Sequence, residues 1–307
     1  MDKDLLILKK DKLYGFIDYS GNIVINPIYK SAEDFSDELA KVITIDDKVE
    51  FINTNGEVVL RPNVDWILNF KNGVAAVKKN NKYGFVDKNG KLVIEAKYDE
   101  ICYDFNEYGF SIIKENNKYG TINLNGDYII KPQFSMLSEC SEGVLIATDL
   151  NDNDGVIDIW GNTLIDFKYK DMGKCKDGMI SFSANRKNGF INLKGEVVIE
   201  PKYNYVTNFS EGLAGFLDGN DNMGCINKIG DVVIKPKYQE LDEFSEGLAV
   251  FTLNDLCGYI DKAGNEVIEN LFLTADDFKN GVALITTQKD AEWGYIDKKG
   301  NWVYRPD

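Results

Sequence analysis

The sequence predicts an all-β fold: a tandem array of nine units of about 35 residues, each forming a small antiparallel sheet. Three observations support this prediction. A glycine-containing motif recurs in register along the chain, each copy is accompanied by three short apolar runs separated by turn residues, and no stretch has sustained helical periodicity. We expect an open, superhelical, solenoid-like array, and the alternative is a closed ring that resembles a β-propeller.

The repeated motif contains an aromatic or polar residue, glycine, a hydrophobic residue, Ile or Val, Asp or Asn, two variable residues and a second glycine. Glu50 replaces the first glycine in the second unit. The first glycines are Gly15, Gly84, Gly120, Gly155, Gly189, Gly224, Gly258 and Gly294, and the second are Gly21, Gly56, Gly90, Gly126, Gly161, Gly195, Gly230, Gly264 and Gly300. This register divides a single array, 1–307, into units at approximately 1–36, 37–70, 71–106, 107–140, 141–175, 176–209, 210–244, 245–278 and 279–307.

Each unit is predicted to contain three strands, which we call A, B and C. In the third unit they are expected at 74–79, 83–87 and 91–98. A less regular segment follows strand C and ends in an aromatic residue, with space for a short turn of helix. The next turn often reads Phe-Ser-Glu-Gly, as at 209–212 and 244–247.

Two features of strand B and the turn that follows have a local explanation. Asp87 and Gly90 suit the first and last positions of a type I turn, where the Asp side chain accepts a backbone N–H two residues on. Asp and Asn alternate at this position along the chain, so its role is hydrogen bonding and not acid–base chemistry. A glycine inside a strand, such as Gly84, predicts a bulge or a close approach by another backbone or ring.

The array is expected to be open because the first and last units each contain a complete set of strands A, B and C. A propeller commonly closes by sharing one blade between its two ends, and no such phase shift is present. Nine blades would also exceed the usual four to eight.

Composition limits the classes of function. The 307 residues carry 50 acidic and 35 basic side chains, for a net charge of −15, and only three arginines, so nucleic acid is not an expected partner. An acidic surface favours a basic protein partner or simply provides solubility. The sequence contains no histidine, the commonest general base and metal ligand.

Cysteines and apolar segments indicate the compartment. Five cysteines without a CxxC pair predict neither a disulfide framework nor a zinc site. The first ten residues lack the apolar core of a signal peptide, and no window approaches a membrane span, so we expect a cytoplasmic location and no membrane contact.

The segment Glu292-Trp293-Gly294-Tyr295-Ile296-Asp297-Lys298-Lys299-Gly300 resembles the core motif of bacterial WG-repeat (KWG-repeat) proteins. The stretch from Phe244 to Asp261 is similar, and the resemblance covers nearly the whole chain. At the position before the first motif glycine, tryptophan occurs only in the last unit. The second and fifth units diverge from the motif, so these two are expected to be less regular. The resemblance implies a β-rich repeat module with an interaction role, and it carries over no catalytic residue.

Candidate chemical sites all have ordinary structural explanations. The acidic pairs Asp276-Asp277 and Asp46-Asp47 lie in predicted loops, and catalysis by a carboxylate pair would require two acidic side chains converging in one pocket. The segments 151–155 and 219–222 resemble the start of a calcium loop, but the position expected to hold a bidentate glutamate is Asn162. We therefore predict no catalytic residue, no cofactor and no metal site.

The cysteines fall at repeat positions that suit small buried side chains. Cys140 and Cys175 take a place that is Phe in other units, and Cys225 and Cys257 flank the glycine of strand B. Because Cys140 and Cys175 belong to adjacent units, they are expected to lie close in space, which is a reason to test them for redox pairing.

Recurrent aromatic residues after strand C are the candidate partner-binding residues. Equivalent residues of a repeat project along one line, so these rings either pave a groove or pack between units. They are Tyr29, Tyr98, Phe134, Tyr169, Tyr203 and Tyr238. The leading hypothesis is a non-enzymatic scaffold for protein–protein interaction; the alternative is a carbohydrate-binding module that uses these rings, and exposure of the rings would distinguish the two.

Overall fold

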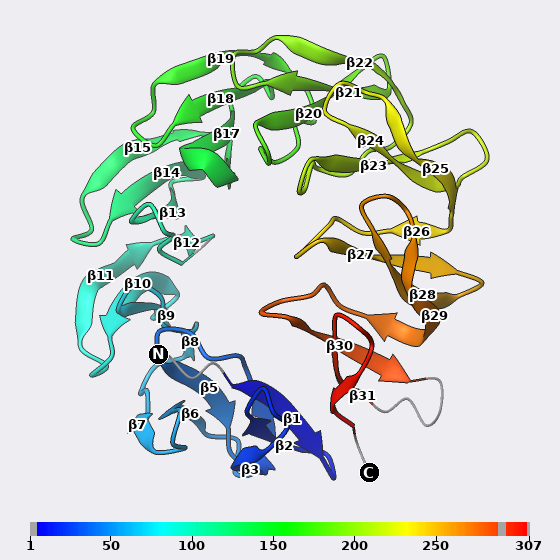
Figure 1. Cartoon of the computed structure of the whole chain (residues 1–307). Coiled ribbons are helices and arrows are strands. Elements are labelled where there is room, and N and C mark those ends of the chain that lie inside the picture. Colours follow the sequence, from blue (N-terminus) through cyan, green and yellow to red (C-terminus); the bar gives the residue numbers. More distant parts are fainter. Residues whose placement is uncertain (1–4, 103, 288–292, 306–307) are drawn as a thin grey trace. The chain divides into compact units, whose positions relative to one another are not determined.

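The computed structural model describes residues 5–102, 104–287 and 293–305. Glu292, the first residue of the motif quoted above, lies outside the described residues, as do the first four and last two residues of the chain. Contacts divide the chain into two compact parts, Met1–Leu137 and Ser138–Asp307, called here the first and second parts. The fold is all-β, as predicted: small antiparallel sheets follow one another, and no described sheet closes into a barrel (Figure 1).

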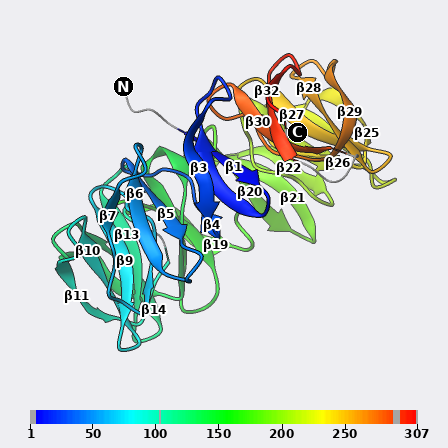
Figure 2. The ribbon, with the colours of Figure 1, turned by 90° about the horizontal axis from the view of Figure 1, so that it is seen from below.

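The first part contains four groups of strands A, B and C, shown in blue and cyan in Figure 2. Each is an antiparallel meander, and each lies within one of the predicted units. The strands are β1 (Leu6–Lys10), β2 (Leu13–Ile17) and β3 (Ile23–Tyr29); β5 (Leu39–Ile43), β6 (Val49–Asn53) and β7 (Val58–Leu60); β9 (Val74–Lys79), β10 (Lys82–Asp87) and β11 (Leu92–Tyr98); β13 (Phe110–Glu115), β14 (Lys118–Asn123) and β15 (Tyr128–Phe134).

The second part contains five such groups. The fifth unit, expected to be irregular, forms a complete one. The strands are β17 (Val144–Thr148), β18 (Asp154–Asp158) and β19 (Thr163–Tyr169); β20 (Met179–Ala184), β21 (Lys187–Asn192) and β22 (Val197–Tyr203); β23 (Leu213–Leu217), β24 (Met223–Asn227) and β25 (Val232–Tyr238); β27 (Leu248–Leu253), β28 (Leu256–Asp261) and β29 (Glu266–Ala275); β30 (Val282–Thr287), β31 (Trp293–Asp297) and β32 (Trp302–Tyr304).

The less regular segment after strand C is extended. In most units it forms a short strand that pairs with strand A of the following unit. Before the sixth and seventh units it forms single bridges instead, Lys170 with Ser183 and Val206 with Phe216. These linking strands are β4 (Ser31–Ala32), β8 (Trp66–Ile67), β12 (Glu100–Ile101), β16 (Met136–Glu139) and β26 (Glu240–Leu241), and β29 serves as both strand C and linking strand. Among the described residues the only helical element is the 3-10 turn η1 (Ser141–Gly143), and none is a helix long and apolar enough to span a membrane.

The glycine inside strand B makes room for the backbone of strand C. A Cβ atom on Gly84 would lie 2.5 Å from the carbonyl oxygen of Ile94 and 2.8 Å from the amide nitrogen of Ala96. The register of β10 and β11 shifts at this point, because Tyr83 pairs with Tyr98 while Phe85 pairs with Ile94. Strand C therefore bulges across the glycine, and both the predicted bulge and the predicted close approach are present.

The second unit shows the result of losing this glycine. Glu50 occupies the position, is buried, and accepts a hydrogen bond from Arg61 Nε at 2.8 Å. Strand C of this unit, β7, has three residues, whereas β3 and β11 have seven. The register of β6 and β7 shifts between Phe51 and Ile52 but shows no shift across position 50, unlike that of β10 and β11 across Gly84, so the predicted irregularity of this unit is confirmed.

The turn between strands B and C forms as the sequence predicts. Asp87 Oδ1 accepts the backbone N–H groups of Asn89 at 3.0 Å and Lys91 at 2.9 Å. Asn123 Oδ1 makes the equivalent bonds in the fourth unit. Asp and Asn therefore play the same hydrogen-bonding role here.

Neighbouring units pack through aromatic rings. The residue after the strand B glycine contacts the aromatic of the next turn, as in Phe85 and Phe105, whose ring centroids are 4.8 Å apart. Phe190 and Phe209 repeat the contact in the second part at 4.7 Å. These rings are fully buried, so the core runs between units more than within them.

The four residues before strand A, called here the A-turn, hold one unit to the next. Ser245 Oγ donates to the carbonyl oxygen of Phe278 at 2.8 Å, and Glu246 Oε2 accepts the N–H of Gly281 at 2.9 Å. The same serine bond joins Ser36 to Phe70 and Ser210 to Phe244. The same carboxylate bond joins Asp37 to Gly73, Glu142 to Gly178, Asp177 to Gly212 and Glu211 to Gly247. In each of these pairs the later A-turn is held by the preceding one.

Replacing a strand B glycine by alanine should be costly. In Gly224→Ala the new Cβ would lie 2.5 Å from the carbonyl oxygen of Ile234, so strand C must shift. We expect the free energy of unfolding to fall by about 2 kcal/mol, as in other overpacked sites, measured by urea denaturation. Gly219→Ala is the matched control, because nothing lies within 4 Å of its Cβ. An equal effect of both substitutions would contradict the steric explanation.

Candidate functional site

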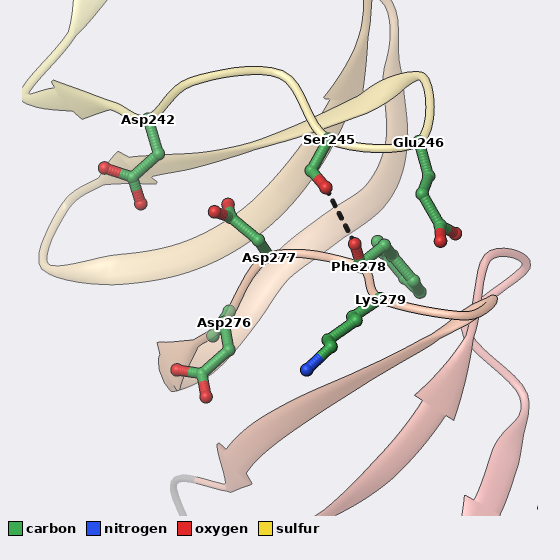
Figure 3. A pocket seen from close by; sticks show the side chains of 8 residues that line it. Asp242, Ser245, Glu246, Asp276, Asp277, Phe278 and Lys279 are labelled. Carbon is green, nitrogen blue, oxygen red and sulfur yellow. Dashed lines mark hydrogen bonds between the residues drawn. The ribbon is translucent and has the colours of Figure 1, made fainter. Parts of the chain in front are cut away.

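A cavity of about 620 Å³ lies between the A-turns of the eighth and ninth units, within the second part (Figure 3). Its walls carry more acidic than basic side chains. The lining residues are Asp242, Ser245, Glu246, Ala275, Asp276, Asp277, Phe278 and Lys279. The carboxylates of Asp242 and Asp277 point toward one another across the space, whereas that of Asp276 turns away (Figure 3).

The repeat architecture places these acids. The N–H groups of Asp242 and Asp276 donate to the carbonyl oxygens of Val250 and Leu284, on strand A of the following unit, both at 2.9 Å. The Tyr259 hydroxyl donates to the carbonyl oxygen of Asp276 at 2.8 Å. The backbone at Asp242 and Asp276 is therefore held by these bonds, while the carboxylates of Asp242 and Asp277 face the cavity.

The three carboxylates are destabilised in their charged form. Partial burial raises the pKa of Asp242, Asp276 and Asp277, and neighbouring carboxylates raise those of Asp242 and Asp277 further. All three remain exposed enough to be reached from solvent. Within the described residues, no hydrogen bond or ion pair is formed by these side chains. A cation that entered the cavity would relieve this repulsion.

The acids are not demanded by the fold. The residue that makes the Asp242-type backbone bond differs from unit to unit, because the bond uses only the main chain. Its equivalents are Glu33, Leu68, Cys102, Gly173 and Thr207. Aspartate stands at this position in two successive units, as Asp242 and Asp276, and Glu33 is the other acidic residue among these equivalents.

Charged neighbours surround the cavity. Glu243 forms an ion pair with Lys176 at 2.6 Å and accepts a hydrogen bond from Asn208 Nδ2 at 3.0 Å. Glu246 pairs with Lys298 at 2.9 Å, and this contact is the main reason that the pKa of Glu246 is lowered. These two glutamates form ion pairs with lysines and the three aspartates form none with the described residues, although the charge of Lys176 partly offsets the rise in the pKa of Asp277.

The first part carries a related polar group at the same repeat position as Asp277. Burial raises the pKa of Asp104 to about 6, against the opposing charges of Lys71 and Lys41. The Oδ1 atoms of Asp104 and Asn69 are buried and accept no hydrogen bond from the described residues. An aspartate with a raised pKa therefore stands just before the aromatic residue in both parts, as Asp104 and Asp277.

The tyrosines predicted as partner-binding residues lie in the core between units. Tyr98 and Tyr238 are 0 % exposed and Tyr29 is 6 % exposed. Tyr169 and Tyr203 are partly buried against Phe182 and Phe216, with ring centroids 5.3 and 5.0 Å apart. This placement favours the packing alternative over a paved groove, since buried rings offer no face to a ligand.

The remaining candidates from the sequence, the pair Asp46-Asp47 and the calcium-like segment, lie outside the cavity. Asp46 is exposed, and Asp47 pairs with Lys30. Asp149 Oδ1 accepts the N–H groups of Asn151 and Asn153, so the calcium-like segment is a hydrogen-bonded turn. No group of three or more potential metal-binding side chains in the described part of the chain could hold a metal ion.

Sequence reasoning identified Asp276 and Asp277 as an acidic pair but assigned them to a solvated loop. It missed Asp242, which is 34 positions earlier and faces them from the preceding A-turn. The register contained the signal, because Asp242 and Asp276 each lie two residues before the aromatic in successive units. The convergence also meets the condition that we set for a carboxylate-pair enzyme.

The sequence profile of a family described as "WG containing repeat" matches residues 14–48, 51–83, 83–119, 119–152, 189–220, 223–257, 258–288 and 293–307. The chain belongs to this WG-repeat family. The matches omit residues 153–188, which include the divergent fifth motif, yet β18 and β19 form an ordinary meander there. The structural repeat thus persists in a WG-repeat unit whose sequence has drifted.

No curated protein matches the sequence. Among solved structures, one titled "Crystal structure of the eukaryotic initiation factor" is similar with a TM-score of 0.66 and 13% identity, covering 98% of this chain and 95% of that one. BamB from Moraxella catarrhalis gives a TM-score of 0.42 at 13% identity, covering 86% and 93%. The WD40 β-propeller domain of Doa1 gives 0.34 at 11% identity, covering 71% and 87%. At this level of identity the first similarity concerns the fold alone.

Neutralising a cavity aspartate should stabilise the protein. Because the pKa of Asp277 is raised in the folded state, its ionised form is less favourable there than in the unfolded chain. We expect Asp277→Asn to increase the free energy of unfolding by a few tenths of a kcal/mol at neutral pH. The gain should shrink as the pH falls through the raised folded-state pKa, because the wild-type carboxyl is then protonated as well.

The measurement is urea denaturation at neutral pH and again near the ordinary pKa of aspartic acid. Asp231→Asn, at an exposed position outside the cavity, is the control and should leave stability unchanged. A loss of stability in Asp277→Asn at neutral pH would show that this carboxylate supports the fold.

Proposed function

We propose that this WG-repeat protein is a non-enzymatic β-repeat scaffold that binds a protein partner, and that the partner presents a basic segment to the cavity between the eighth and ninth A-turns. The observation that carries the proposal is the set of three aspartates with raised pKa values that line the cavity, where Asp242 and Asp277 point toward one another. Their ionised forms repel one another until a cation arrives, so a lysine or arginine side chain would be attracted there.

The overall charge supports the same partner chemistry. A net charge of −15 steers basic proteins toward the surface and repels nucleic acid. Long-range attraction and a local acidic cavity act together, the first on the rate of encounter and the second on where the partner is held. Both weaken as salt is added, because exposed charges are screened.

Binding of a basic protein segment fits this cavity better than binding or hydrolysis of a sugar does. Enzymes and lectins that recognise sugars commonly offer the ring an aromatic face, but the aromatic residue lining this cavity, Phe278, is only 1 % exposed. The recurrent tyrosines are largely buried too, so they do not favour the carbohydrate-binding alternative that was based on them. A carboxylate pair alone, without a way to position a substrate, leaves catalysis the weaker explanation.

The proposal is tested by affinity capture with the full chain as bait at physiological salt, quantified by mass spectrometry. We expect Asp242→Asn/Asp276→Asn/Asp277→Asn to lose a partner that the wild type captures stoichiometrically, by about tenfold or more. The matched control is Asp166→Asn/Asp221→Asn/Asp231→Asn, which removes the same charge from exposed positions of the second part.

The comparison separates the cavity from general charge attraction. Equal loss with both triple variants would assign binding to net charge and overturn the cavity as the contact. Capture that is unaffected by either variant and by added salt would overturn the basic-partner proposal as a whole.

A further inference from the structure

Two cysteines occupy equivalent positions in consecutive A-turns of the second part. Cys140 and Cys175 stand where the other A-turns place an aromatic ring. Those aromatic residues are Phe35, Phe70, Phe105, Phe209, Phe244 and Phe278. A thiol thus appears twice in succession at a position that otherwise carries a large ring.

The two A-turns are clamped together around the sulfur atoms. The backbone N–H of Cys175 donates to Cys140 Sγ at 3.0 Å, so this sulfur touches the main chain of the other cysteine. Ser141 Oγ donates to the carbonyl oxygen of Cys175 at 2.6 Å. The N–H of Gly178 donates to Glu142 Oε1 at 2.7 Å. Three bonds therefore hold the two cysteine-bearing segments in one arrangement.

Both side chains lie in a single apolar cluster. Cys140 is 3 % exposed and Cys175 is 0 % exposed, and they share this cluster with Val156 and Ile180. Both are free cysteines. Because the fold already holds the two residues together, joining them would require little further loss of chain entropy, and this favours a disulfide at equilibrium.

We propose that Cys140 and Cys175 are a dithiol modification site, which a hydroperoxide converts into an intramolecular disulfide. One thiol attacks the peroxide O–O bond, giving a sulfenic acid and releasing the remaining oxygen as water or alcohol. The second thiol then attacks this sulfur, the S–O bond breaks, and water leaves. The two sulfurs together lose two electrons and two protons, and the peroxide is reduced.

The surroundings make this reaction slow but selective. Burial raises the pKa of both thiols, and the charge of Glu142, which accepts the Cys175 S–H at 3.4 Å, raises that of Cys175 further. The reactive thiolate is therefore scarce in the folded protein. Once the sulfenic acid has formed, the neighbouring cysteine is the nearest thiol, so the pair is expected to join in preference to other combinations.

The experiment treats the full chain with hydrogen peroxide at mildly alkaline pH, after alkylation of accessible thiols in the native state. Peptide mapping by mass spectrometry without reductant then identifies linked cysteines. We expect a peptide pair joined through Cys140 and Cys175, lighter by two hydrogen atoms and separated by reductant. The thermal unfolding midpoint should rise with the linked fraction and return to its starting value after reduction.

Controls keep the result interpretable even where a variant folds poorly. Cys175→Ala should abolish the link, whereas Cys225→Ala, at another buried cysteine, should leave it intact. In urea the five cysteines of the wild type should pair without preference. Linkage of Cys140 to Cys175 that is seen only in urea, or native linkage that uses Cys225 as often, would overturn the proposal, as would sulfinic acid at either position without any link.

Discussion

The junction between consecutive A-turns is the interaction on which the rest of this protein depends. A three-stranded sheet is too small to bury its own faces, so each unit packs against a side chain of the next. The contact is made by an aromatic ring, as in Phe51 against Phe70, and the serine and carboxylate bonds of the A-turns fix where that ring stands. Stability and the placement of every side chain near the A-turns follow from this contact.

The same junction leaves some positions free to vary. The bond that anchors the residue before each A-turn uses only the main chain, and for this reason the side chain there ranges from Gly173 to Asp242. Charge gathered at such positions does not disturb the repeat. The aspartates of the cavity are tolerated in this way, at a small cost in stability that a bound cation would offset.

The fifth and sixth A-turns show how far the junction can be altered. Cys140 and Cys175 replace the aromatic ring, and Val156 stands where other units place a large residue after the glycine, yet the meander of β17, β18 and β19 is complete. Backbone hydrogen bonds between strands and A-turns evidently preserve the unit when the ring is lost. The family profile does not match residues 153–188, although the structural repeat is retained there.

The sequence by itself determined the all-β class, the three strands of each unit and the role of both motif glycines, because these depend on local turn chemistry and on spacing. It also identified the second unit as irregular, where Glu50 replaces the glycine, but it wrongly expected the same of the fifth unit. Tertiary structure alone decided which residues face one another. Whether Tyr98 is buried or exposed, and whether Asp242 meets Asp277, depends on how one unit packs on the next, and residues 34 or 35 positions apart reveal that contact only after the chain has folded.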